Sequence, residues 1–178
     1  FSGGITGTPA LATGSGTETD PYRIGTAEGL KWFRDKVNNA TKEPDTKICA
    51  ELTKDIDLSG EAWTPIGNYT EGNQIYYEGT FDGGGHTVSG LNVTGKFRYV
   101  SLFGAVKGGT IKNLTVAGNV SHNYYSTGLD CHVGGIVGGA LDAATIENCS
   151  NNCSVTGSSS DYVGGIAGSN INNARIID

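Results

Sequence analysis

The sequence predicts an all-β protein, a right-handed parallel β-helix with one short N-terminal capping helix. Glycine supplies 29 of the 178 residues and proline only 4, and the glycines have no three-residue period, which excludes collagen. Short runs of leucine and β-branched residues alternate with Thr, Asn and Ser, and no helical pattern separates them. From Gly79 onward the chain also repeats itself. A β-sandwich is the alternative, but its strands should be longer and should lack glycine-punctuated copies.

The repeat is read most clearly from three apolar-apolar-glycine blocks. They are Leu102-Phe103-Gly104, Ile136-Val137-Gly138 and Ile166-Ala167-Gly168. An isoleucine follows each block after seven or eight residues, at Ile111, Ile146 and Ile176. Successive coils of a β-helix stack about 4.8 Å apart. We therefore expect the three isoleucines to form one interior row, with glycines and asparagines at the corners.

Three regions follow one another along the chain. Residues 1–19 resemble a linker or an irregular lead-in, because Gly, Thr and Ser dominate them. Residues 20–78 form an N-terminal cap that holds the first strands and a helix near 27–38, with Thr26 as its N-cap. Leu30, Phe33 and Val37 make the apolar stripe of that helix. Residues 79–178 form the coils.

The charge and the ends of the chain restrict its partners and its setting. The net charge is −6 and no basic run is present, so we do not expect nucleic acid as a partner. No apolar stretch approaches the roughly 18 residues that a membrane span requires. The chain starts at Phe1 without methionine and stops in an apolar run, so we expect a processed or excised piece truncated at its C-terminus.

Four cysteines, at positions 49, 131, 149 and 153, match no zinc-binding template because no CxxC pair occurs. The sequence therefore predicts no metal ligands and no cofactor. Cys131 and Cys153 lie nearest to turns and are the favoured pair if the chain has a disulfide, which a secreted protein allows.

The blocks Val-Gly-Gly-Ile-Val-Gly at 133–138 and Val-Gly-Gly-Ile-Ala-Gly at 163–168 resemble the GLUG motif of bacterial surface proteins. Residues 55–60, 63–67 and 79–88 resemble the lead-in to such repeats. The resemblance implies an extracellular or cell-surface location in adhesin-like or immunoglobulin A1 peptidase-like proteins. It also implies further domains in the same polypeptide. In the peptidase relatives the hydrolytic chemistry belongs to a separate zinc domain.

The chain lacks the HExxH motif of such a domain, since none of His86, His122 and His132 has that context. Asp55, Asp57 and Asp82 are open to two interpretations. They are either surface and turn residues or the paired carboxylates of a polysaccharide-active enzyme. The fragment is therefore expected to be non-catalytic, with no catalytic residue assigned.

Tyrosines are the candidate binding residues, because exposed aromatic rings in loops stack on sugars or anchor a protein partner. Tyrosines of this kind are Tyr69, Tyr76, Tyr77, Tyr124 and Tyr125, and the last four are the candidates for a binding site. The leading hypothesis is a surface scaffold that presents loops to a glycan or a host protein. The alternatives are an accessory region of a secreted peptidase, a polysaccharide-active β-helix and a pure spacer.

Overall fold

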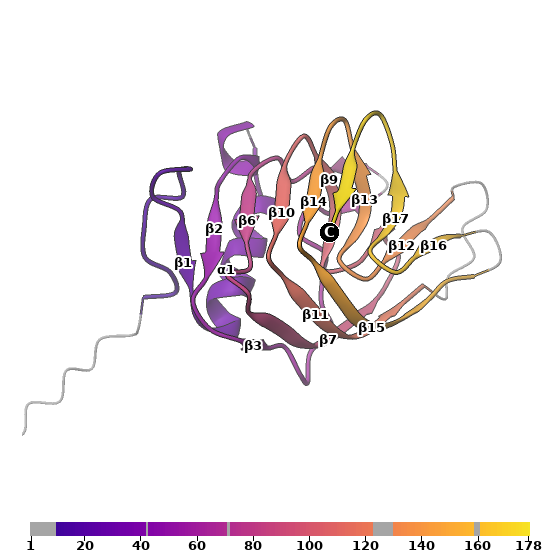
Figure 1. Cartoon of the computed structure of the whole chain (residues 1–178), viewed down its shortest axis with the longest axis horizontal. Helices are drawn as coiled ribbons and strands as arrows, with labels where there is room; N and C mark the ends of the chain where they lie inside the picture. Colours follow the sequence, from indigo (N-terminus) through magenta and orange to yellow (C-terminus); the bar gives the residue numbers. More distant parts are fainter. Residues whose placement is uncertain (1–9, 42, 71, 123–129, 159–160) are drawn as a thin grey trace, which may run out of the picture.

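The computed structural model describes residues 10–178, apart from 42, 71, 123–129 and 159–160. The chain winds into a parallel β-solenoid of about five turns and carries one short helix, which confirms the predicted fold class (Figure 1). The longest sheet has six strands in the order β1-β2-β6-β10-β14-β18, and every pair in it is parallel. Its strands are β1 (Tyr22–Ile24), β2 (Ala50–Leu52), β6 (Thr80–Asp82), β10 (Thr110–Lys112), β14 (Thr145–Glu147) and β18 (Arg175–Ile177).

Three further parallel sheets complete the walls of the solenoid. The second wall stacks β3 (Ile56–Asp57), β7 (Thr87–Thr94), β11 (Thr115–Ser121) and β15 (Ser150–Thr156). The third stacks β8 (Tyr99–Val100), β12 (His132–Gly134) and β16 (Tyr162–Gly164), and the fourth stacks β9 (Phe103–Lys107), β13 (Val137–Leu141) and β17 (Ala167–Asn170). A short antiparallel hairpin, β4 (Tyr69–Thr70) and β5 (Asn73–Gln74), branches from the second coil.

The expected interior row is present. Ile111 is in register with Ile146, and Ile146 is in register with Ile176. Phe81 extends the row by one coil toward the N-terminus. Because each coil buries the one before it, Ile111 and Ile146 are 0% and 1% exposed, whereas Ile176 on the last coil is 45% exposed.

The helix α1 (Ala27–Asn38) closes the N-terminal end of this interior. Thr26 is its N-cap, and the Gly29 N–H donates to Thr26 Oγ1 at 3.0 Å. The stripe of Leu30, Phe33 and Val37 is fully buried. The Phe33 ring packs 5.7 Å from Phe81, the first large side chain of the interior row. A 3₁₀ turn, η1 (Glu43–Thr46), follows the helix, and no helix in the described part of the chain is long and apolar enough to cross a membrane.

Glycine and asparagine occupy the corners for two different physical reasons. A Cβ on Gly134 would lie 2.0 Å from the Val137 carbonyl oxygen, so close backbone approach requires glycine there. Asn113 and Asn148 instead adopt positive φ angles of 53° and 49°. Their side chains bond one another, since Asn148 Nδ2 donates to Asn113 Oδ1 at 3.3 Å. These asparagines are turn residues in a vertical column, as their repetition suggested.

Candidate functional site

The structure separates the four candidate tyrosines. Tyr77 is completely buried, and its hydroxyl donates to the Ile48 carbonyl oxygen at 2.9 Å. It packs beside Phe33 and Phe103, so it belongs to the core and not to a binding surface. Tyr76 is partly exposed. Tyr124 and Tyr125 lie outside the described residues.

Tyr76 belongs to a row of rings that we call the aromatic ladder: Tyr76, Tyr69, Tyr99, His132 and Tyr162. The ring centroids are separated by 6.0, 5.6, 4.9 and 5.1 Å in that order. The last two steps are stacked, with interplanar angles of 16° and 8°. Register in the third wall produces this stacking, since β12 pairs His132 with Tyr99 on one side and with Tyr162 on the other.

Two cations flank the aromatic ladder. The Arg98 guanidinium lies 5.3 Å from the Tyr69 ring centroid, and Lys107 Nζ lies 5.5 Å from that of Tyr76. Exposure is greatest at the C-terminal end of the ladder, where Tyr162 is 53% exposed while His132 is 6% exposed. The open rings and the two cations together suit a ligand with flat apolar faces and negative charge.

Three rings of the ladder, those of Tyr76, Tyr99 and His132, are uncharged at neutral pH. Desolvation raises the pKa of the Tyr99 phenol and also that of the Tyr76 phenol. Desolvation, followed by the positive charge of Arg98, lowers the pKa of His132 below its ordinary value. These three rings are therefore neutral at pH 7 and act as stacking surfaces.

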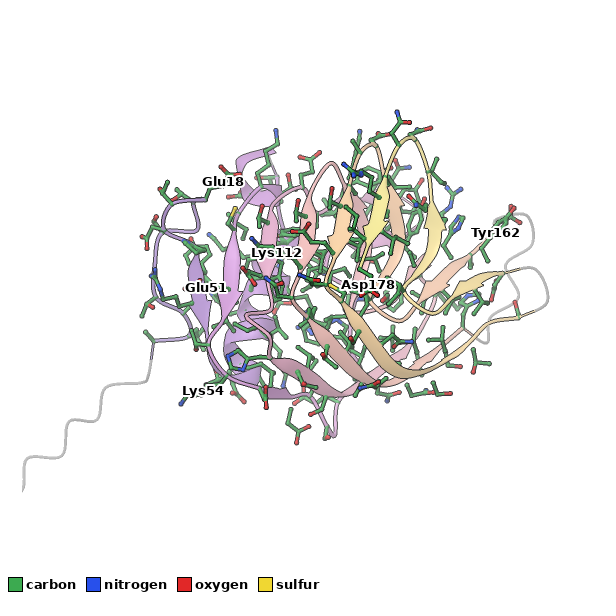
Figure 2. All side chains as sticks on the ribbon, viewed as in Figure 1. Glu18, Glu51, Lys54, Lys112, Tyr162 and Asp178 are labelled. Carbon is green, nitrogen blue, oxygen red and sulfur yellow. The ribbon has the colours of Figure 1, made fainter. Side chains whose placement is uncertain are left out.

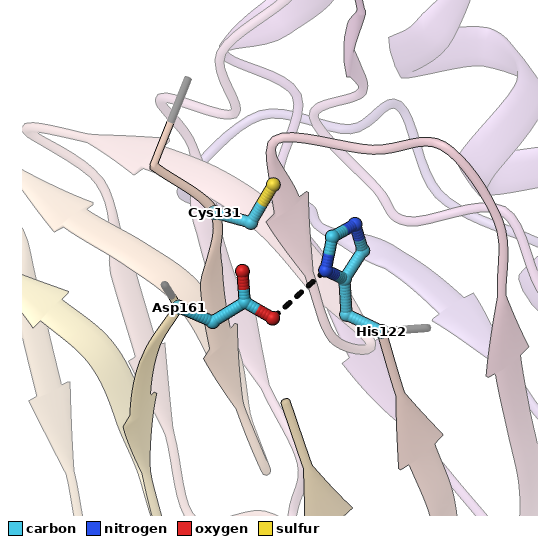
Figure 3. Close-up of side chains that lie close together, drawn as sticks. All are labelled: His122, Cys131 and Asp161. Carbon is cyan, nitrogen blue, oxygen red and sulfur yellow. Dashed lines mark hydrogen bonds and ion pairs between the residues drawn. The ribbon is translucent and has the colours of Figure 1, made fainter. Parts of the chain in front are cut away.

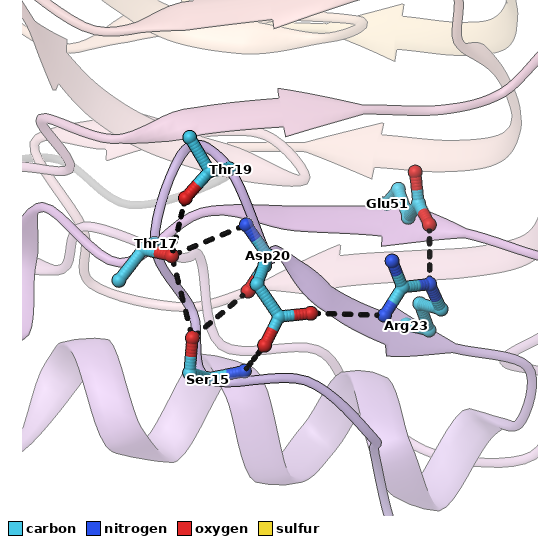
Figure 4. A network of polar contacts seen from close by, with 6 residues as sticks. All are labelled: Ser15, Thr17, Thr19, Asp20, Arg23 and Glu51. Atoms are coloured by element: carbon cyan, nitrogen blue, oxygen red, sulfur yellow. Dashed lines mark hydrogen bonds and ion pairs between the residues drawn. The ribbon is translucent and has the colours of Figure 1, made fainter.

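A second surface feature is an open groove of about 520 Å³ on the six-stranded sheet. Its lining includes Glu18, Glu51, Asp82 and Lys112. Figure 2 labels Glu18, Glu51 and Lys112, which lie away from Tyr162, with Glu18 and Glu51 toward the N-terminal side of the molecule. Glu51 is held by Arg23 at 3.0 Å, and Arg23 in turn bonds Asp20 in the polar network of the lead-in (Figure 4).

Asp82, one of the carboxylates of this groove, is poorly suited to act as a general acid. Desolvation raises the pKa of Asp82, but hydrogen bonds from Asn113 and the Gly84 N–H, with Lys112 nearby, outweigh it and hold the pKa below its usual value. Glycoside hydrolysis needs a carboxylic acid that keeps its proton at neutral pH, which requires a raised pKa. Asp82 is instead an ionised partner for Lys112, 3.5 Å away.

Asp57 acts as a turn residue, whereas Asp55 bonds residues of a neighbouring coil. Asp55 Oδ1 accepts from the Thr87 N–H at 2.9 Å and lies 3.2 Å from His86 Nδ1. Asp57 Oδ1 accepts from the Ser59 N–H at 2.9 Å. Hydrogen bonds lower the pKa of both carboxyls, from Thr87 and His86 to Asp55 and from Ser59 to Asp57. Asp57 supports a local turn, which is one of the two interpretations of the sequence, whereas Asp55 connects its coil to the coil that carries β7.

The structure also brings together three residues that the sequence did not group: His122, Cys131 and Asp161 (Figure 3). One potential ligand atom from each lies within 4.8 Å of the others. His122 Nδ1 and Asp161 Oδ2 are 2.8 Å apart, and both side chains are 2% exposed. Burial, followed by the negative charge of Asp161, raises the pKa of the Cys131 thiol. No local motif signals this cluster, since Asp161 is contributed by the following coil.

Cys131 and Cys153, the favoured pair if the chain has a disulfide, are not bonded to each other in this structure. Cys131 lies beside His122 and Asp161, whereas Cys153 is on β15 and packs against the hydrophobic core. Desolvation raises the pKa of Cys153 to about 11, as expected for a thiol that serves as a small apolar side chain. The position of two cysteines near turns in the sequence does not show that they lie close together in the fold.

The chain is a parallel β-solenoid, as its interior rows and its columns of corner residues show. The aromatic ladder lies along its third wall. No protein-family model matches the chain. Over 175 residues the chain is 29% identical to a halomucin from Haloquadratum walsbyi, in an alignment that covers 89% of this chain and 2% of that protein. The crystal structure of an immunoglobulin A1 protease-like protein from Bacteroides ovatus is similar with a TM-score of 0.65 and 24% identity.

The likeness to the solved structure concerns the fold, and it covers 89% of this chain and 55% of that chain. The chain thus spans only a small fraction of the halomucin and about half of the solved protein.

Proposed function

We propose that this chain is a non-catalytic β-solenoid segment of an extracellular surface protein and that the aromatic ladder binds glycans. The likeness to an immunoglobulin A1 protease-like protein supports the extracellular setting, because immunoglobulins are extracellular proteins. The resemblance of residues 133–138 and 163–168 to the GLUG motif of bacterial surface proteins supports the same setting.

One observation carries the binding role: open tyrosine faces lie beside cations on one wall. Tyr162 is exposed on one side of its stack with His132, and Tyr69 and Tyr76 are partly exposed beside Arg98 and Lys107. Sugar rings stack on tyrosine faces through their C–H groups, and acidic sugars add a charge for the cations. Arg98 and Lys107 supply local positive charge in a chain whose net charge is −6, and although Asp142 lies 3.7 Å from Lys107, this charge favours acidic glycans at this wall.

A glycan array that contains matched neutral and acidic oligosaccharides tests this proposal. We expect the wild-type chain to bind acidic members and Tyr162→Ala to weaken binding several-fold, because the exposed stacking face is lost. Tyr162→Phe keeps the ring and should bind nearly as well. Ile171→Ala, which removes another exposed apolar side chain, is the matched control. An array without any signal, or equal losses in Tyr162→Ala and Ile171→Ala, would rule out the ladder as the glycan site.

The open groove on the six-stranded sheet favours one second candidate, a polysaccharide-active enzyme. Its three carboxylates line an accessible surface, which is the feature that such enzymes need. Release of reducing ends from acidic polysaccharides by the wild-type chain, abolished in Glu51→Gln, would support this candidate. The ion pairs of Glu51 and Asp82 with Arg23 and Lys112 favour the non-catalytic proposal.

A further inference from the structure

We infer that His122, Cys131 and Asp161 form a binding site for a zinc-class divalent metal ion. The three side chains supply one imidazole, one sulfur and one carboxylate, and one donor atom from each lies within 4.8 Å of the others. Zinc binds these donor types at about 2.0–2.3 Å, which places tetrahedral ligands roughly 3.3–3.8 Å apart. An ion would replace the hydrogen bond between His122 Nδ1 and Asp161 Oδ2, so these two atoms, now 2.8 Å apart, would separate slightly while the more widely spaced ligand atoms move closer.

The backbone holds the three residues in place from two adjacent coils. The His122 N–H donates to the Thr156 carbonyl oxygen at 2.9 Å, which fastens the end of β11 to the end of β15. The Tyr162 N–H donates to the Cys131 carbonyl oxygen at 2.8 Å, so Cys131 and the residue after Asp161 are tied together. These hydrogen bonds between adjacent coils hold His122 beside Thr156 and Cys131 beside Tyr162, the residue after Asp161. A preorganised ligand set loses little conformational entropy when it binds an ion.

The surroundings also favour a metal ion over a surface contact. The side chains of His122 and Asp161 are each 2% exposed and Cys131 is 4% exposed. Asp161 Oδ2 additionally accepts a hydrogen bond from the Ser158 N–H, which orients the carboxylate. Such outer contacts are typical of metal ligands, because they hold the ligand in one orientation.

The donor chemistry selects the class of ion. Sulfur and imidazole ligands favour zinc and neighbouring transition metals, whereas calcium and magnesium prefer oxygen atoms alone. Three protein ligands leave a fourth tetrahedral position for water or another donor. The ion would link His122 and Cys131 on one coil to Asp161 on the next coil. It would thereby stabilise the wall that carries the aromatic ladder.

Metal titration of the full chain tests this inference. The protein, treated with a chelator and kept reduced, is titrated with Zn²⁺ by calorimetry and with Co²⁺ by absorption spectroscopy. We expect one equivalent of each ion to bind, a sulfur-to-cobalt charge-transfer band, and a higher Tm with Zn²⁺ but not with Ca²⁺. Cys131→Ser should remove the charge-transfer band and weaken Zn²⁺ binding by at least about a hundredfold.

Cys153→Ser is the matched control, because it removes a partly buried thiol from the core side of β15. It should keep both the band and the affinity. Asp161→Asn is the second variant if Cys131→Ser fails to fold, and it should also weaken Zn²⁺ binding. Failure of the wild-type chain to bind Zn²⁺, or equal affinities of the wild type, Cys131→Ser and Asp161→Asn, would overturn the inference.

Discussion

Single residues at the corners of the solenoid adopt backbone conformations that their side chains do not favour. Ala143 has a φ of 64°, in the left-handed region, and its counterpart one coil later is Asn173 with a φ of 63°. Asparagine and glycine tolerate this region, whereas alanine places its Cβ against the following carbonyl group. Ala143 is exposed, so no packing contact compensates for the strain.

Ala143→Gly should therefore stabilise the protein, raising the free energy of unfolding by about 0.5–1 kcal/mol. Urea denaturation followed by circular dichroism measures the change. Ala62→Gly, at another exposed alanine that lacks a positive φ, should have the opposite sign because glycine gains more freedom on unfolding. Destabilisation of equal size by both variants would contradict this explanation.

At the scale of elements, polar columns connect successive strands of the six-stranded sheet. Asp82 at the end of β6 accepts a hydrogen bond from Asn113 Nδ2 at 2.9 Å and lies 3.5 Å from Lys112 Nζ on β10. Asn148 continues the column by donating to Asn113. The column ties three coils together at the same corner, where the main chain leaves one wall for the next.

Asp82→Asn should weaken this column and change the acid dependence of stability. The pKa of Asp82 is lower in the folded chain than its ordinary value of 3.8. Its contribution is therefore present above the ordinary pKa and is lost as the pH falls through the folded pKa. We expect the variant to lose about 1 kcal/mol of unfolding free energy at pH 7 and to show a smaller further loss on acidification.

Denaturant titrations between neutral pH and about pH 3 give this comparison, since the ordinary aspartate pKa lies in that interval. Asp178→Asn, at the exposed last residue, is the control and should follow the wild type. Parallel stability curves for the wild type and Asp82→Asn across the whole range would refute a role for this charge.

At the scale of the whole molecule, burial depends on the position of a coil in the stack. The interior row of Ile111, Ile146 and Ile176 is closed by α1 at one end and open at the other. The last coil accordingly exposes large apolar side chains, of which Val163 and Ile171 are 48% and 41% exposed. Each coil is stable because its neighbours cover it, so stability should be distributed unevenly along the solenoid axis.

Equivalent substitutions in one row test this gradient. Ile146→Ala should lower the free energy of unfolding by about 2–5 kcal/mol, because it leaves a cavity between two coils. Ile176→Ala removes the same atoms from the half-exposed end and should cost less than about 1 kcal/mol. Chemical denaturation of both variants provides the measurement, and equal losses would show that the two sites are not equivalent rungs of one stack.

Some features could be predicted because they depend on local or repeated patterns. The helix with its Thr26 cap follows from capping and from a stripe at helical spacing. The row from Ile111 to Ile176 follows from repetition alone, since equivalent positions of a solenoid must stack. The sequence did not show that Tyr77 belongs to the core. The alternation of apolar and polar residues near the β4–β5 hairpin is too short to show whether Tyr76 or Tyr77 points inward.

By itself the sequence determined the wound parallel architecture, the interior row of isoleucines and the residue types at the corners, since the repeated apolar positions of successive coils can be buried only by stacking on one another. Only the tertiary structure decided which side chains from different coils meet. The aromatic ladder and the cluster of His122, Cys131 and Asp161 arise because stacking places residues some 30 positions apart side by side, and insertions at the corners shift that alignment. No local pattern encodes such a meeting, so these sites became visible only in the folded chain.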